Sequence, residues 1–200
     1  MGTYAESSFH EETSGGGRKV SKNLRLALVA IFAALIAVGT MISIPLPPPL
    51  FEITLAPAIY LAYAALGDKW DAFTATAVGG FVGELYNIST KAGGSPIYPF
   101  GMIWARAPEA LIVGWAVGRG RRTLALAMVA ATAYETFAFL VPDWLFYRYA
   151  LFGYSVSSGS TALGLALFDL GTFADLAFIP VAFLIIAAAR PSFRRLGYLQ

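Results

Sequence analysis

The chain has 200 residues, of which 58% are apolar and only 13% are charged, and its mean hydropathy is +0.65. Soluble domains carry about 25% charged residues, so this composition excludes an ordinary soluble domain and predicts an integral membrane protein. Glycine and proline are frequent, as they are in membrane helices. The chain contains no cysteine, which excludes disulfides and thiolate chemistry.

The N-terminal segment, residues 1–23, is polar, rich in glycine and serine, and without apolar periodicity. This composition predicts a disordered tail. The basic residues that follow precede an apolar stretch too long for the core of a secretory signal, and no convincing cleavage site follows. We therefore expect a cytoplasmic tail over 1–23, a membrane domain over 24–190 and a cytoplasmic C-terminal tail over 191–200.

The apolar runs predict an all-α bundle of six transmembrane helices, because crossing about 30 Å of hydrocarbon takes about 20 helical residues. The second predicted span is short and contains Pro57, and the sixth is long enough to tilt. The predicted spans are Leu24–Ile44, Phe51–Leu66, Asp71–Ile88, Phe100–Val117, Thr123–Val141 and Thr161–Ala189.

The distribution of lysine and arginine predicts the orientation, because cytoplasmic loops collect these residues. If the N-terminus is cytoplasmic, every basic residue lies on the cytoplasmic side except Lys91 and Arg148 outside and Arg106 within a span. The chain is therefore predicted to be N-in and C-in. The outer connections 45–52, 89–99 and 142–160 are longer than the inner turns; they either cover a site as a lid or merely join helices.

Five carboxylates and one arginine lie within the predicted spans. A charge in mid-membrane costs at least ~2.5–3.5 kcal/mol, so such residues usually face the protein interior and mark a site. Counted from the outer ends of the spans, all but one lie roughly 6–14 Å below the outer boundary, and only Asp175 is deeper. The residues are Glu84, Arg106, Glu109, Glu135, Asp169 and Asp175.

The stretch WARAPEA places two of these charges around a proline. Arg106 and Glu109 are three residues apart and can pair on one helix face. Pro108 has no backbone donor, so the carbonyl of Trp104 is free for a ligand or a side chain. The alternative is a buried ion pair that only fixes helix packing, but the excess of acids over arginine favours a binding site.

Aromatic residues accompany the same layer, which is typical of a small-molecule pocket, although membrane interfaces also collect tryptophan and tyrosine. Trp104 and Tyr134 are the strongest candidates because they lie on the helices that carry the charges. The predicted substrate-binding residues are Glu84, Trp104, Arg106, Glu109, Tyr134, Glu135 and Asp169.

Several kinds of catalysis are not expected. No P-loop motif is present, and the single histidine, His10, lies in the tail, which excludes Ser–His hydrolysis and makes zinc catalysis unexpected. Asp169 and Asp175 are six residues apart on one helix, and we expect them on different faces rather than as a catalytic pair. We therefore expect neither an enzyme nor a bound metal or cofactor.

Small residues recur on the first span at a spacing that lets another helix approach closely. The pairs are Ala30 with Ala34 and Ala33 with Ala37. They serve either a partner protein or packing within the bundle.

The stretches ALVAIFAALIAVGTMISIPLP and FEITLAPAIYLAYAALGDKWDAFTATAVGGFVGEL, followed by further spans, resemble the substrate-binding (S) components of energy-coupling factor transporters, the prokaryotic vitamin importers. The resemblance covers nearly the whole chain beyond the tail. It implies a multi-pass protein of the prokaryotic cell membrane that binds a vitamin-like solute from outside. A separate transmembrane subunit and two ATPase subunits would supply energy, and Ala30 and Ala34 would dock that transmembrane subunit.

The resemblance leaves the solute open, since the biotin and thiamine signatures are not clear, and the lack of a histidine near the N-terminus argues against nickel or cobalt. The surplus of acids favours a cationic or donor-rich solute, unless Arg106 anchors an anionic one. We expect no nucleic acid partner. Two other functions stay open: a membrane scaffold of cell-envelope assembly, and a proton-coupled secondary transporter.

Overall fold

The computed structural model describes residues 20–45, 52–90, 97–149, 151 and 159–198, and within them the fold is all-α with six helical segments. The first three are α1 (Lys22–Met41), α2 (Ala56–Leu66) and α3 (Lys69–Thr90). The fourth joins α4 (Tyr98–Gly101), the π-helical turn η1 (Met102–Arg106) and α5 (Glu109–Ala116). The last two are α6 (Arg121–Tyr149) and a run of α7 (Gly159–Ala166), the 3-10 segment η2 (Leu167–Phe178) and α8 (Ile179–Arg195).

The predicted fold class is thus confirmed as far as six helices are concerned. Three of them, α1, α6 and the run Gly159–Arg195, are long and apolar enough to cross a membrane. They indicate a multi-pass membrane protein. Six crossings with both termini inside remain a prediction, as does the tail over 1–23, of which residues 1–19 lie outside the described residues.

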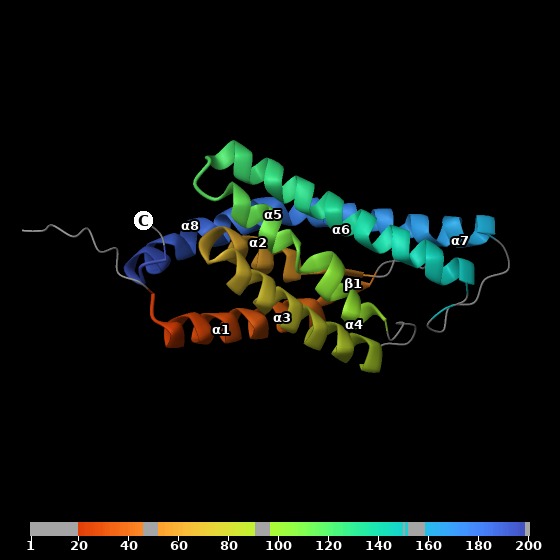
Figure 1. Cartoon of the computed structure of the whole chain (residues 1–200), viewed down its shortest axis with the longest axis horizontal. Helices are drawn as coiled ribbons and strands as arrows, with labels where there is room; N and C mark the ends of the chain where they lie inside the picture. The colour runs from red at the N-terminus through yellow and green to blue at the C-terminus, as the bar shows by residue number, and fades with distance from the viewer. Residues whose placement is uncertain (1–19, 46–51, 91–96, 150, 152–158, 199–200) are drawn as a thin grey trace, which may run out of the picture.

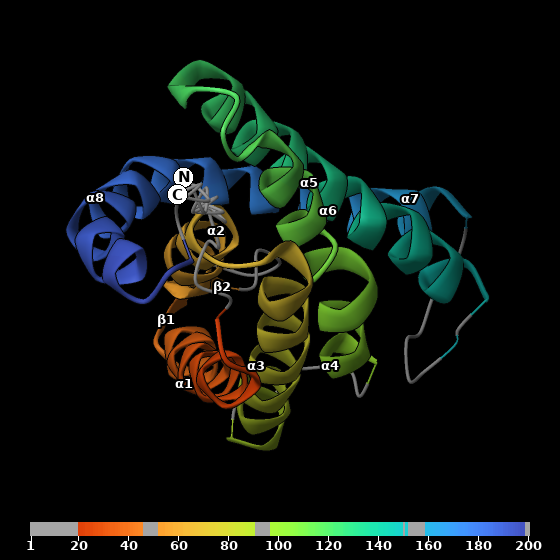
Figure 2. The ribbon, with the colours of Figure 1, turned by 60° about the vertical axis from the view of Figure 1, so that its left-hand side comes forward.

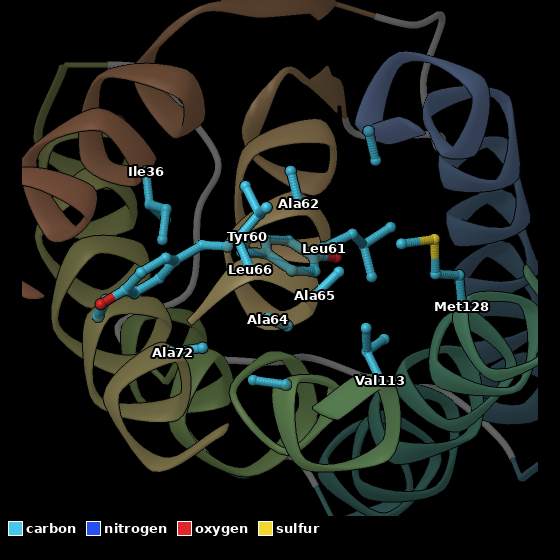
Figure 3. Close-up of a cluster of buried hydrophobic side chains, with 14 of the residues drawn as sticks. Ile36, Tyr60, Leu61, Ala62, Ala64, Ala65, Leu66, Ala72, Val113 and Met128 are labelled. Atoms are coloured by element: carbon cyan, nitrogen blue, oxygen red, sulfur yellow. The ribbon is translucent and has the colours of Figure 1, made fainter. Parts of the chain in front are cut away.

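The short helix α2 lies at the centre of the bundle, where all its residues except Ile59 are buried. It packs against α1, α3, α5 and α8 (Figure 2). Pro57 is tolerated because it lies in the first turn, where its missing amide would have no helical acceptor. In Figure 3, side chains of α2 are surrounded by Ile36, Ala72, Val113 and Met128 of four other helices. The centre of the fold is therefore one fully covered helix.

The segment before α2 differs from the prediction. Residues 51–54 were expected to begin the second span, but β2 (Glu52–Thr54) forms an antiparallel hairpin with β1 (Ser43–Pro45), with Ser43 opposite Thr54. The hairpin also ends α1 at Met41, earlier than predicted. It gives these backbone groups partners within the protein. At 1.5 Å per residue, α2 is only about 16 Å long, which is too short to cross a membrane.

Helices α1 and α3 lie side by side at a very close approach (Figure 1). A β-carbon on Gly79 would meet the backbone carbonyl of Ala33, and one on Gly83 would lie 2.8 Å from the carbonyl oxygen of Ala37. The absence of these two side chains therefore sets the distance between the helices. Ala33 and Ala37 pack inside the bundle, whereas Ala30 and Ala34 on the same helix are exposed.

The helix ends that the basic residues predict to be cytoplasmic lie together at one end of the bundle (Figure 1). The Arg25 guanidinium donates to both carboxylate oxygens of Asp71, at 2.9 and 2.8 Å, which joins the starts of α1 and α3. Tyr198, just after α8, lies next to the same pair, and burial raises the pKa of its phenol. The turn from α5 to α6 contains Gly118 and Gly120, both at positive φ that glycine adopts without strain.

Two helices continue beyond their predicted ends. Helix α6 runs through Pro142 to Tyr149, so residues 142–149 of the predicted outer loop are helical, while most of the remainder lies outside the described residues. The last helix passes Pro191 and reaches Arg195, inside the segment assigned to the C-terminal tail. Proline at 142 suggested a break, but a side chain from another helix takes over the lost hydrogen bond, as described below.

The sixth segment changes its helical period in the middle. Segment η2 is a 3-10 helix with about three residues per turn, so residues three apart lie on one face. Asp169, Thr172 and Asp175 therefore share the face toward α6, where the hydroxyls of Thr172 and Thr136 are hydrogen-bonded. The expectation that Asp169 and Asp175 point to different faces assumed the α-helical period of about 3.6 residues and was wrong.

Candidate functional site

The described part of the chain contains a buried charged cluster around Arg106, which is 8% exposed. Its Nε donates to Oε1 of Glu135 at 2.7 Å, and its second terminal nitrogen lies 3.8 Å from Oδ2 of Asp175. The guanidinium also lies over the ring of Tyr60, 5.8 Å from its centroid. The cluster thus draws side chains from α2, η1, α6 and η2.

The partner of Arg106 differs from the predicted one. Arg106 and Glu109 were expected to pair on one helix face, but Arg106 reaches across to α6 and bonds Glu135 instead. The reason lies in the backbone, because η1 is a wide π-helical turn in which the amide of Ala107 donates to the carbonyl of Met102. This turn changes the α-helical spacing that the predicted pairing requires.

Glu109 lies in the same cluster without a hydrogen bond. It is 0% exposed, and neither carboxyl oxygen has a hydrogen-bond partner among the described residues. Its charged and titratable neighbours are Glu135, Tyr60, Arg106 and Asp175, and the Tyr60 hydroxyl lies near its carboxyl without the geometry of a full hydrogen bond. The hydroxyl of Tyr60 is directed to Oε2 of Glu135, at 3.5 Å. Three acids therefore surround a single arginine, and two of them already contact it.

Pro108 was predicted to leave the carbonyl of Trp104 available for a ligand or a side chain. In the structure a side chain forms a hydrogen bond with it. Tyr134 donates its hydroxyl to this carbonyl at 2.8 Å. The Trp104 indole donates in turn to the carbonyl of Ala138, at 3.2 Å, which is the acceptor that Pro142 leaves without a helical partner. Each proline thus frees a carbonyl that the facing helix satisfies, so Trp104 and Tyr134 join two helices.

Asp169 belongs to a second polar group, nearer the ends of α6 and α7. Its carboxyl interacts with that of Asp143 on α6, and Tyr98 donates to Oδ2 of Asp143 at 3.2 Å. Both aspartates are buried, and Oδ2 of Asp169 has no hydrogen-bond partner among the described residues. Asp143 was missed from the sequence because it follows Pro142, which suggested a loop.

Glu84 lies apart from both groups. It is half-buried on α3, and the Asn87 side chain donates to its Oε2 at 3.4 Å and to the Thr40 carbonyl of α1 at 3.1 Å. It therefore belongs to the α1–α3 interface. The single polar layer predicted from the sequence consists of three separate groups in the structure.

Two residues of the Arg106 cluster were absent from the predicted site. Asp175 was left out because its count from the outer end set it below the other charges, whereas its carboxylate lies 3.8 Å from the Arg106 guanidinium. Tyr60 lies in an apolar stretch, IYLAY, that reads simply as core. The only available signal was a tyrosine in a fully buried helix, since a buried hydroxyl generally needs a partner. No group of three or more metal-ligating residues occurs among the described residues.

Comparison with known proteins adds no assignment: no family model matches the chain, and no similar sequence was found among curated proteins. The resemblance to S components of energy-coupling factor transporters therefore stays a prediction from the quoted stretches.

Proposed function

We propose that this protein is the substrate-binding subunit of a membrane transporter for a vitamin-like solute, and that its site is the Arg106 cluster. One observation carries the proposal. Arg106, Glu109, Glu135 and Asp175 converge from three of the six helical segments in the interior, although each costs free energy there. Buried charges that only hold helices together are expected in equal numbers of each sign. Here three acids share a single arginine.

The acid surplus also separates this proposal from the scaffold alternative. A scaffold uses its outer surface, and it gains nothing from Glu109, a carboxyl that is fully buried and lacks a hydrogen bond. A binding subunit gains a place where a solute completes the hydrogen bonding. The site would lie under the outer loops of a prokaryotic cell membrane protein, as the resemblance implies.

Energy would come from other subunits, because the sequence has no P-loop motif with which to hold ATP. A transmembrane subunit carrying two ATPases would dock on α1. The exposure of Ala30 and Ala34 supports this part of the proposal, because small exposed residues permit close approach of another helix. The neighbouring pair Ala33 and Ala37 is already used against α3.

Native mass spectrometry of the detergent-purified protein tests the proposal, first as isolated and then after incubation with a mixture of water-soluble vitamins. We expect one discrete bound mass in the vitamin range. Glu135→Gln should lower its occupancy, while Glu84→Gln, which changes a carboxyl outside the cluster, should not. A protein that remains without bound solute after incubation would contradict the proposal and favour the scaffold.

A further inference from the structure

Glu109 is the buried group of the Arg106 cluster whose bonding is least complete. Its side chain is 0% exposed, neither carboxyl oxygen makes a hydrogen bond of good geometry among the described residues, and the one donor near it is the Tyr60 hydroxyl. An ionised carboxylate in such surroundings is strongly destabilised unless a positive charge or several donors reach it. Glu109 therefore needs either a bound proton or a cationic group beside its carboxylate.

The groups around Glu109 do not supply that charge. Arg106 of η1 is committed to Glu135 at 2.7 Å and lies 3.8 Å from Asp175. Tyr60 of α2 offers one neutral hydroxyl, which lies near both Glu109 and Glu135, and Asp175 of η2 adds a further acid. Helix α3 also packs on α5, but its described part presents no charged group among the neighbours of Glu109.

We propose that Glu109 is the residue that receives a cationic N–H group of the solute, and that it holds a proton in that place while the site is empty. This inference rests on the proposed function. On binding, the carboxyl O–H bond of Glu109 breaks and its proton leaves to solvent. The ammonium or amidinium group of the solute then donates to the resulting carboxylate. One positive charge replaces another, so the net charge of the site does not change.

The same geometry disfavours an anionic solute. Arg106 would have to leave Glu135 to meet an anion, and the released carboxylate would then stand beside Glu109 and Asp175. Like charges at such short distances in a low dielectric repel strongly. Of the two alternatives that the sequence left open, the cluster therefore fits a cationic solute better than an anionic one anchored by Arg106.

Infrared spectroscopy in ²H₂O tests the proton without any solute, because a protonated carboxyl has an absorption band that a carboxylate or an amide lacks. We expect the band of the solute-free protein to lose one component in Glu109→Gln and none in Asp68→Asn, which removes an exposed carboxylate paired with Arg25. Glu109→Asp, which retains a carboxyl, should keep a shifted component and guards against misfolding of the glutamine variant. A band unchanged by Glu109→Gln would overturn the inference.

The second part of the inference, the charge of the solute, is tested with an equimolar mixture of six vitamins. Thiamine and pyridoxamine are cationic, riboflavin and nicotinamide are neutral, and biotin and pantothenate are anionic. We expect native mass spectrometry to find a cationic member bound, with at least about tenfold lower occupancy in Glu109→Gln than in Glu84→Gln. An anionic member bound equally by both variants would overturn the inference and leave the proposed function standing. Binding of no member would contradict the proposed function, and the infrared result would still decide whether Glu109 holds a proton.

Discussion

The α1–α3 interface and the Arg106 cluster hold helices together in opposite ways. Between α1 and α3, glycines leave α3 without side chains at two points of contact, so that its backbone lies against α1 at Gly79 and Gly83. Around Arg106, long charged side chains reach between helices, and the nearest contact is the 2.7 Å hydrogen bond to Glu135. Both are interior contacts of one small bundle.

The difference separates packing from function. The glycine interface leaves few polar atoms without partners, and small residues at a helix contact are a sufficient explanation for it. The Arg106 cluster leaves Glu109 without a hydrogen bond, and packing does not explain an acid kept in such a place. The following four variants test this contrast, from the largest expected effect to the smallest.

Arg106→Met should lower the free energy of unfolding by about 3–5 kcal/mol, because it leaves Glu135 and Asp175 buried without a cation. Chemical denaturation in detergent measures this loss. Arg119→Met is the matched control, since Arg119 is exposed and only covers the ring of Trp115, so its loss should be about 0.5–1 kcal/mol. Adding Glu135→Gln to Arg106→Met should restore part of the stability; equal losses for the two arginines would show that the cluster is not a buried ion pair.

Gly79→Ala should destabilise the protein by about 1–3 kcal/mol, because the new β-carbon collides with the backbone carbonyl of Ala33 and the helices must separate. The thermal midpoint in detergent provides the measurement. Gly164→Ala has open space around its β-carbon and should leave stability unchanged or raise it slightly, since alanine favours a helix. If both variants behave alike, close approach does not hold α1 to α3.

Tyr134→Phe should lower the free energy of unfolding by about 0.5–1.5 kcal/mol, because the Trp104 carbonyl loses the hydroxyl that replaces its helical donor. Tyr149→Phe removes a hydroxyl from the same helix at a residue that is 66% exposed, and serves as the control. The same chemical denaturation resolves the pair. A Tyr134 variant as stable as the control would mean that solvent or lipid headgroups satisfy the carbonyl.

Ala34→Leu should change the free energy of unfolding by less than about 0.5 kcal/mol, because Ala34 is exposed on α1. Ala33→Leu, one residue earlier, fills the contact with Gly79 and should destabilise by about 1–3 kcal/mol. Thermal unfolding of the two variants side by side makes the comparison. A destabilised Ala34 variant would show that this face packs within the bundle and is not available to a partner.

Much of the fold could be predicted from local composition. Apolar runs and their breakers located six helical segments, and the residues of WARAPEA indicated a freed carbonyl, which Tyr134 indeed occupies. The prediction failed where a side chain from another helix replaced a backbone hydrogen bond within the helix. Pro142 was expected to end a helix because it leaves the Ala138 carbonyl without a backbone donor. The indole of Trp104 donates to that carbonyl instead, and the helix continues.

The sequence predicted which residues form the candidate site better than it predicted how they are arranged. The predicted depths grouped Arg106, Glu109 and Glu135, and the structure brings these three residues into one cluster, although the helix of Glu135 continues past its predicted end. The prediction misplaced Asp175 and overlooked Asp143, since the 3-10 period turns Asp175 toward α6 and the helix continues through the proline before Asp143. Neither feature has a sequence signal of its own.

The sequence by itself determined that the charges are few, that acids exceed cations within the apolar stretches, and that several helices are apolar enough to cross a membrane, because composition fixes transfer free energies. Only the tertiary structure decided which acid neutralises Arg106. Pairing depends on distances of a few ångströms between side chains on different helices, and the π-helical and 3-10 turns set those distances. The same turns left Glu109 as the acid without a partner.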